Sequence, residues 1–71
     1  MANSLSELSK TYEKSIALQQ EIIERYRQRL NRAKTELNFK EMQRLNALIK
    51  MLNDEKKDLE VSAYELKKYL S

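Results

Sequence analysis

The chain of 71 residues contains neither glycine nor proline. Tight turns with positive backbone φ angles, β-hairpin turns and phosphate-binding loops all depend on glycine. Its absence therefore argues against a β-rich fold and against a glycine-rich nucleotide site. The remaining composition, with 35% charged residues and abundant leucine, glutamate, lysine, arginine and glutamine, is typical of helical bundles and coiled coils. We expect an all-α protein.

Cysteine and histidine are also absent, which removes disulfides, thiolate metal sites and the commonest general base. No Cys or His is available to serve in a nucleophilic dyad. The closely spaced acids Glu21 with Glu24, and Glu55 with Asp58, lie outside the helix–helix seam and are better explained as solvated ion-pairing groups. We expect no enzymatic activity, no cofactor, no metal and no small-molecule substrate.

No apolar run approaches the length of about 20 residues that spans a bilayer, and no helix face is strongly hydrophobic and opposed by a basic face. The first ten residues lack the basic and apolar regions of a signal peptide. These features predict a cytoplasmic protein without membrane contact. A single core in so short a chain rarely contributes more than about 3–5 kcal/mol, which leaves oligomerisation as the remaining means of stabilisation.

Two sets of capping signals predict two helices. Ser4 is followed three residues later by Glu7, and Asn38 is followed three residues later by Glu41, as in capping boxes. We therefore expect one domain with a first helix over residues 5–36, a turn at 37–38 and a second helix over 39–70. At the turn, Leu37 should pack onto Met42 and Phe39 should pack over the end of the hairpin.

The apolar residues follow the seven-residue repeat of a coiled coil, in which positions a and d form the seam between helices. Eight of ten seam positions are apolar in the first helix and eight of nine in the second. The step from Leu37 to Met42 is five residues, which would rotate the stripe by about 140° on one continuous helix. The pattern therefore predicts a break near residue 38 and an antiparallel hairpin.

When the helices fold back on each other, facing seam residues have numbers that add up to 75. Leu30 then faces Leu45, and Ile23 faces Leu52. The two long polar seam residues, Gln19 and Lys56, obey the same rule and should share a layer in which the amide oxygen accepts a hydrogen bond from the ammonium. One matched polar layer commonly fixes the register of a coiled coil.

The two sides of this hairpin differ in chemistry. One side, formed by positions e and b, is polar and should be solvated. The other side, formed by positions g and c and called here the g/c side, has an apolar centre bounded by arginines and by acids. It consists of Leu8, Leu18, Ile22, Arg25, Arg29 and Arg32 of the first helix and Arg44, Leu48, Met51, Glu55, Asp58 and Tyr69 of the second. Contiguous exposed apolar surface usually marks an interface.

These features predict a small structural or interaction protein that forms a homodimer, with two hairpins packed as a four-helix bundle. The contact should be made by Leu18, Ile22, Leu48 and Met51. A two-fold rotation about this centre brings Arg25 and Arg29 to Glu55 and Asp58 of the second copy. The same g/c side could instead dock on a different protein, which would make the chain an accessory subunit.

Nucleic-acid binding is the main alternative function. Residues 25–50 carry a net charge of +6, whereas the rest of the chain carries −3, so the end of the hairpin at the turn, here called the tip, is basic. Phosphate contacts would come from Arg27, Arg32, Lys34, Lys40 and Arg44. No separate recognition helix is evident, and the arginines are divided between the two sides of the hairpin.

Overall fold

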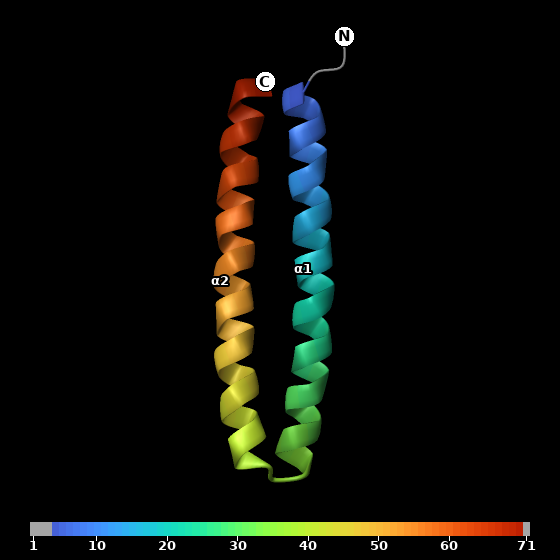
Figure 1. The fold of residues 1–71 in the computed structure, drawn as a ribbon, viewed down its shortest axis with the longest axis vertical. Coiled ribbons are helices and arrows are strands. Elements are labelled where there is room, and N and C mark those ends of the chain that lie inside the picture. The colour runs from blue at the N-terminus through green and yellow to red at the C-terminus, as the bar shows by residue number, and fades with distance from the viewer. Residues whose placement is uncertain (1–3, 71) are drawn as a thin grey trace.

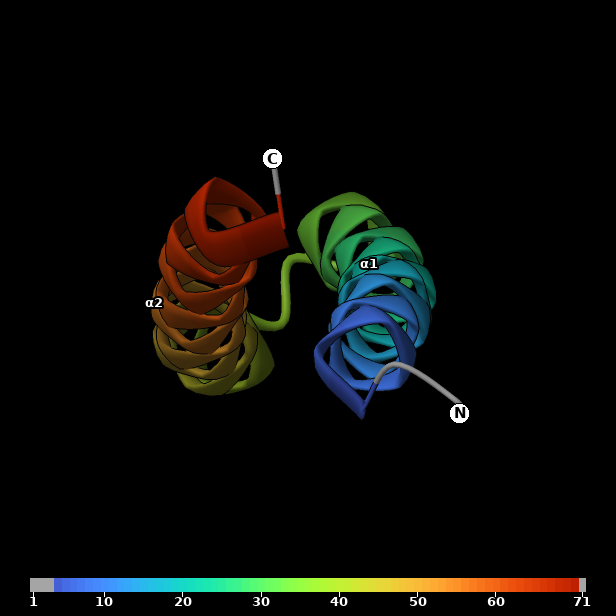
Figure 2. The same ribbon diagram turned by 90° about the horizontal axis from the view of Figure 1, so that it is seen from above.

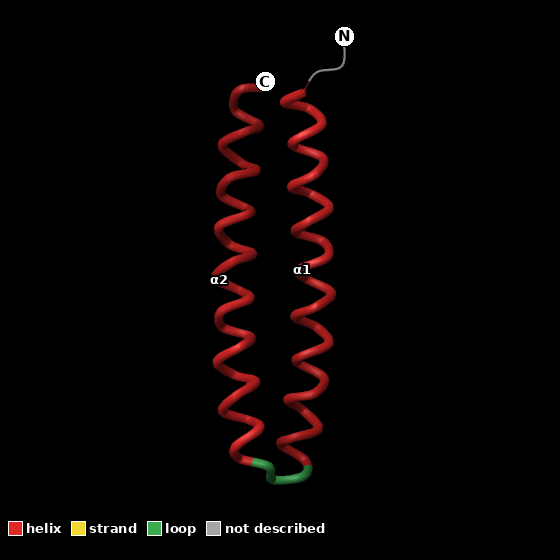
Figure 3. The backbone as a smooth tube through the Cα atoms, viewed as in Figure 1, coloured by secondary structure: helices red, strands yellow, loops and turns green. Residues whose placement is uncertain are grey.

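A computed structural model, which describes the backbone of residues 4–70 and the side chains of residues 5–69, consists of two antiparallel helices (Figure 1). Helix α1 comprises Ser4–Thr35 and helix α2 comprises Phe39–Leu70. The connection is a short turn (green in Figure 3) at the end of a rod measuring 55 × 16 × 13 Å. The predicted hairpin is confirmed, and the predicted helix bounds agree to within one residue at each end.

Helix α1 ends in a Schellman motif, a pattern of two backbone hydrogen bonds that closes many helices. The amide of Asn38 donates to the carbonyl of Ala33 at 2.9 Å, and the amide of Leu37 donates to the carbonyl of Lys34 at 3.2 Å. This motif requires a left-handed residue, and Leu37 provides it with a φ angle of 57°. Glycine normally fills such a position because it has no Cβ atom. Here a leucine fills it.

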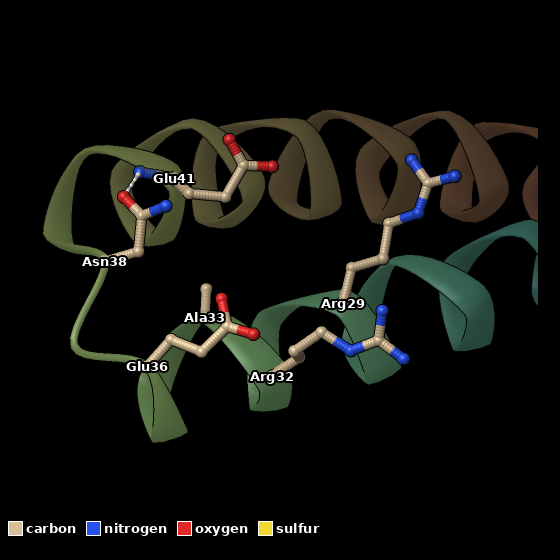
Figure 4. A pocket seen from close by; sticks show the side chains of 6 residues that line it. All are labelled: Arg29, Arg32, Ala33, Glu36, Asn38 and Glu41. Carbon is tan, nitrogen blue, oxygen red and sulfur yellow. Dashed lines mark hydrogen bonds between the residues drawn. The ribbon is translucent and has the colours of Figure 1, made fainter.

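Helix α2 begins at the predicted cap. The Asn38 side-chain oxygen accepts a hydrogen bond from the amide of Glu41 at 3.2 Å (Figure 4). The predicted packing of Leu37 onto Met42 and of Phe39 over the hairpin end is wrong, because Leu37 is 69% exposed and Phe39 is 67% exposed. Leu37 ends α1 in the left-handed conformation, so it is not available as an apolar staple for α2. The side chain of Ser4, expected to cap α1, lies outside the described residues.

The core lies in the half of the hairpin nearer the tip and is built from residues of the predicted seam. Ile23 and Leu45 are fully buried, and they pack in one cluster with Leu30, Ala33 and Ile49. Partly buried side chains complete this cluster: Tyr26, Met42 and Leu52. The seam positions of the two helices therefore face each other as the seven-residue repeat requires.

A polar layer joins α1 and α2 around Gln19 and Lys56, where it was predicted, but its hydrogen bonds differ from the predicted one. The Lys56 ammonium donates to the side-chain oxygen of Gln20 at 2.6 Å, and not to Gln19. The Gln19 amide nitrogen instead donates to the backbone carbonyl of Leu52 at 3.2 Å and to the Glu55 carboxylate at 3.1 Å. The side chains of the adjacent residues Gln19 and Gln20 therefore both reach α2.

The half of the hairpin near the chain ends, called here the base, is packed less tightly. Its buried residues are small, namely Ser9 and Ala63. The larger seam residues Tyr12, Ile16 and Leu59 are only half-buried. Viewed along the rod, the helices are inclined to each other and not strictly parallel (Figure 2). The Leu5–Leu70 layer expected at this end includes a side chain outside the described residues.

Candidate interaction surface

The four apolar residues predicted to form an interface lie where the sequence pattern placed them, two on each helix. Leu18 is 59% exposed and Met51 is 50% exposed, while Ile22 and Leu48 are half-buried. None of the four belongs to the core cluster. We call these four residues, which lie at g and c positions of the repeat, the apolar strip, and of the four only Leu18 and Met51 are exposed.

Three arginines of α1 border this strip toward the tip. Arg25, Arg29 and Arg32 are exposed, and none of them forms an ion pair with another described residue. The Arg29 guanidinium lies 5.3 Å from the centre of the Tyr26 ring, which holds it beside the seam. Arg25, Arg29, Tyr26 and Ile22 line a shallow hollow, so the basic groups surround a partly apolar floor.

Two acids of α2 border the strip toward the base. Glu55 accepts a hydrogen bond from Gln19, and Asp58 has no hydrogen bond or ion pair with the described part of the chain. Both acids line a second hollow together with Tyr12, Leu59 and Ser62. The g/c side thus carries a basic hollow and an acidic hollow, one on each side of the apolar strip.

Several charges elsewhere on the hairpin have partners within the chain. Arg27 pairs with Glu24 at 3.3 Å. Further pairs join Lys67 to Glu13 at 3.3 Å and Lys56 to Glu60 at 3.6 Å. Exposed pairs of this kind contribute little to stability, about 0–1 kcal/mol each. They do show which charged groups already have partners. The charged residues that border the apolar strip form no ion pair with another described residue: Arg25, Arg29, Arg32, Glu55 and Asp58.

The residues predicted to contact phosphate are divided by the structure. Arg27 is paired as described, and the Arg44 guanidinium donates two hydrogen bonds to Glu41, at 2.6 and 3.0 Å. These bonds hold the pKa of the Glu41 carboxyl below its ordinary value of 4.5, with a smaller contribution from the charge of Arg29, and raise the pKa of Arg44. The exposed residues Arg32, Lys34 and Lys40 form no ion pair with any residue in 4–70.

A third hollow lies at the tip, between the end of α1 and the start of α2 (Figure 4). Its walls are mixed in charge: Arg29, Arg32, Ala33, Glu36, Asn38 and Glu41. Within the described chain, no group of three or more acidic residues is placed to hold a metal ion. Neither α1 nor α2 is long and apolar enough to cross a membrane.

The apolar side chains of Leu37 and Phe39 at the tip are exposed, which the seven-residue repeat did not predict. The sequence carries no mark of this position, because the left-handed residue that ends α1 is a leucine where glycine is usual. Comparison with known protein families, with curated proteins and with solved structures finds no match to this chain. Functional inference therefore depends on the residues themselves.

Proposed function

We propose that this protein is a non-enzymatic interaction protein that forms a homodimer through its g/c side. Two hairpins would pack as a four-helix bundle, with the apolar strips of both copies in contact. The observation that carries this proposal is the arrangement of a partly exposed apolar strip between unpaired arginines on one flank and unpaired acids on the other. Such a surface is complementary to itself after a two-fold rotation.

The orientation follows from the positions of these residues along the rod. The apolar strip is centred near Ile22, and rotation about that centre exchanges tip and base. Arg29 of one copy then lies at the level of Asp58 of the other, and Arg25 lies close to the level of Glu55. A dimer with adjacent tips would instead bring two basic ends together, which is repulsive at low ionic strength.

The exposed area supports the need for a partner. The chain exposes 5798 Å², whereas a folded monomer of its mass of 8.5 kDa typically exposes roughly 4,700 Å². The difference exceeds the roughly 800 Å² that each partner buries in a standard protein interface. A second copy on the g/c side would cover an area of this size and would contribute apolar burial that a two-helix hairpin lacks.

Disruption of the apolar strip should give monomers. We expect Ile22→Glu combined with Leu48→Glu to halve the mass measured by light scattering and to lower the thermal midpoint. Val61→Glu combined with Tyr64→Glu is the matched control, because both side chains are exposed and lie outside the g/c side. A wild-type protein that stays monomeric at high micromolar concentration would overturn the proposed homodimer.

Charge reversal tests the orientation. Arg29→Glu should weaken the dimer because it would face Asp58 of the second copy, and adding Asp58→Arg should restore the affinity. Exposed pairs contribute about 0.2–1 kcal/mol, so we expect the dissociation constant to change by a few fold and to respond to salt. Arg27→Glu is the control, because Arg27 pairs with Glu24 on its own helix. A lack of rescue in the double variant would argue against the antiparallel arrangement.

Two alternatives use the same molecule differently. Phosphate contact at the tip would be made by Arg32, Lys34 and Lys40, which lack ion pairs in the described chain, in preference to Arg27 and Arg44, which are paired. Retention on DNA or RNA that falls steeply with salt would support this reading. Docking of the g/c side on a different protein would instead show as a monomer that nevertheless depends on Ile22 and Leu48 for its interaction.

A further inference from the structure

The backbone at Leu37 has a conformation that is unfavourable for a leucine, and the hydrogen bonds of the Schellman motif hold it there. A left-handed φ angle of 57° brings the Cβ atom of a leucine too close to the neighbouring carbonyl oxygen. Burial of the side chain in the core would compensate for this strain, but Leu37 is 69% exposed. Strained residues of this kind tend to occur where a protein binds something. An exposed leucine in this conformation is therefore a candidate contact residue.

Phe39 lies two residues further on and is exposed to nearly the same degree, at 67%. Asn38, between them, takes part in two hydrogen bonds. Its amide donates to the carbonyl of Ala33, and its side-chain oxygen accepts from the amide of Glu41 and so caps α2. Leu37 and Phe39 belong to the connection between α1 and α2 and its first helical residue, and this connection lies at one end of the rod (Figures 1 and 3). Exposed single apolar residues are ordinary, whereas two that flank a strained turn form a small apolar patch.

Basic residues flank this patch. Lys34 lies in the last turn of α1 and Lys40 in the first turn of α2, and neither forms an ion pair within residues 4–70. Of the nearby acids, Glu41 is held by two hydrogen bonds from Arg44. Glu36, next to Leu37, is also exposed and forms no ion pair within residues 4–70, so the tip presents exposed apolar side chains with two unpaired ammonium groups and one unpaired carboxylate.

We propose that the tip binds an anionic lipid surface, with Leu37 and Phe39 inserted among the head groups and Lys34 and Lys40 against the lipid phosphates. Nucleic acid would satisfy the lysines but would leave Leu37 and the strain at its backbone without a role. The hollow at the tip is lined mainly by charged side chains and not by Leu37 or Phe39 (Figure 4). A fluid lipid interface accepts projecting apolar side chains without a matching pocket.

This binding would be peripheral, since neither helix can cross a bilayer. The prediction of no membrane contact followed from the lack of a spanning run and of an amphipathic basic helix face. Leu37 and Phe39 lie instead at the connection between the two helices. Each lysine near an anionic membrane contributes an attraction that falls off with salt. The proposal does not depend on the homodimer, because the tip lies outside the apolar strip of the g/c side.

Vesicle sedimentation tests the proposal directly. Wild-type protein should sediment with vesicles of phosphatidylcholine and phosphatidylserine, and less with phosphatidylcholine alone. Leu37→Asn, which tolerates the left-handed conformation, and Phe39→Ser should each weaken this binding by about tenfold. Tyr64→Ser, at an exposed aromatic residue remote from the turn, should bind as the wild type does. Equal binding by Leu37→Asn, Phe39→Ser and wild type would overturn the insertion.

Reversal of charge tests the role of the lysines. Lys34→Glu combined with Lys40→Glu should abolish the preference for anionic vesicles, whereas the matched pair Lys14→Glu with Lys57→Glu should retain it. Both lysine pairs are exposed, so circular dichroism should report intact helices in each variant. Binding to single-stranded DNA without binding to vesicles would overturn the proposal in favour of a nucleic-acid site.

Insertion also has a spectroscopic readout, because the chain contains no tryptophan. Phe39→Trp introduces a single reporter, whose emission should shift to shorter wavelength when anionic vesicles are added. Tyr64→Trp, placed on the base half of α2, should not shift. An unchanged Phe39→Trp spectrum under conditions where the protein sediments with vesicles would show that the tip stays in water and would overturn the proposal.

Discussion

Leu37 is the only residue in 4–70 with a positive φ angle, and it shows how one position can limit the stability of the whole hairpin. The hydrogen bonds around it are satisfactory, since the amides of Leu37 and Asn38 both reach carbonyls of α1. The difficulty is confined to the side chain, whose Cβ atom is unsuited to this conformation. Because the Leu37 side chain is 69% exposed, its contacts within the hairpin are few.

Leu37→Gly should make the protein more stable, because glycine adopts this conformation without strain. We expect the free energy of unfolding to rise by about 0.5–1 kcal/mol after allowing for the greater flexibility of glycine in the unfolded chain. Thermal unfolding at fixed protein concentration should show a midpoint higher by several degrees. Leu37→Ile, with a branched Cβ, should lower it. A Leu37→Gly variant less stable than wild type would mean that the leucine side chain packs within the protein.

Glu41 has two roles at the start of α2. Its amide is capped by Asn38, and its carboxylate is bonded to Arg44. The carboxyl pKa is lower in the folded chain than its ordinary value of 4.5, chiefly because of the hydrogen bonds from Arg44. The folded state therefore favours the ionised form, and this stabilisation is present above the unfolded pKa and is lost as the pH falls through the folded one.

Glu41→Gln should consequently destabilise the protein at neutral pH and cease to do so in acid. The difference in thermal midpoint between wild type and variant should be constant near pH 7 and should shrink as the pH falls below 4.5. Glu21→Gln, at an exposed position of α1 without an ion pair in the described chain, is the control and should show no such change. A difference that persists in strong acid would indicate that the carboxylate charge is not the cause.

The two helices differ in how firmly they hold each other along their length. Near the tip, branched and long apolar side chains are buried in one cluster. Toward the base, the buried seam residues are Ser9 and Ala63, and the larger seam residues remain half-buried. Local opening is expected to start where few apolar contacts must be broken. We therefore expect the base to open before the tip.

Two isoleucines at equivalent seam positions measure this difference. Ile23 is fully buried, so Ile23→Ala should lower the free energy of unfolding by about 2–5 kcal/mol. Ile16 is half-buried, and Ile16→Ala should cost distinctly less. Amide hydrogen exchange should likewise be slowest around Ile23 and Leu45 and fastest toward the chain ends. Equal losses in the two alanine variants would show that the base is packed as firmly as the tip.

The elements were predictable because their formation depends on spacing. The apolar repeat and the five-residue step after Leu37 determine the number of helices, their direction and their register. The same repeat placed the apolar strip of the g/c side. Details that depend on individual side-chain conformations could not be predicted from this spacing. One example is the hydrogen bond of Lys56, which goes to Gln20 and not to Gln19. The left-handed Leu37 was missed because no glycine or asparagine marks that position.

At the scale of the whole molecule, the two proposed surfaces lie on different parts of one rod. The g/c side runs along the length of the hairpin, whereas the lipid-binding residues are confined to the tip. In the proposed dimer the hairpins are antiparallel, so one tip would lie at each end of the four-helix bundle. A dimer of this form can contact two anionic surfaces at once, while a single hairpin can contact only one.

Vesicle clustering therefore separates the two proposals. Wild-type protein should increase the turbidity of a suspension of phosphatidylserine-containing vesicles, because each dimer would bridge two of them. Ile22→Glu with Leu48→Glu should still sediment with vesicles but should not cluster them, since a monomer has one tip. Leu37→Asn with Phe39→Ser should remain dimeric and should neither bind nor cluster. Binding without clustering by a wild-type dimer would place both tips at the same end and would contradict the antiparallel arrangement while leaving the lipid site intact.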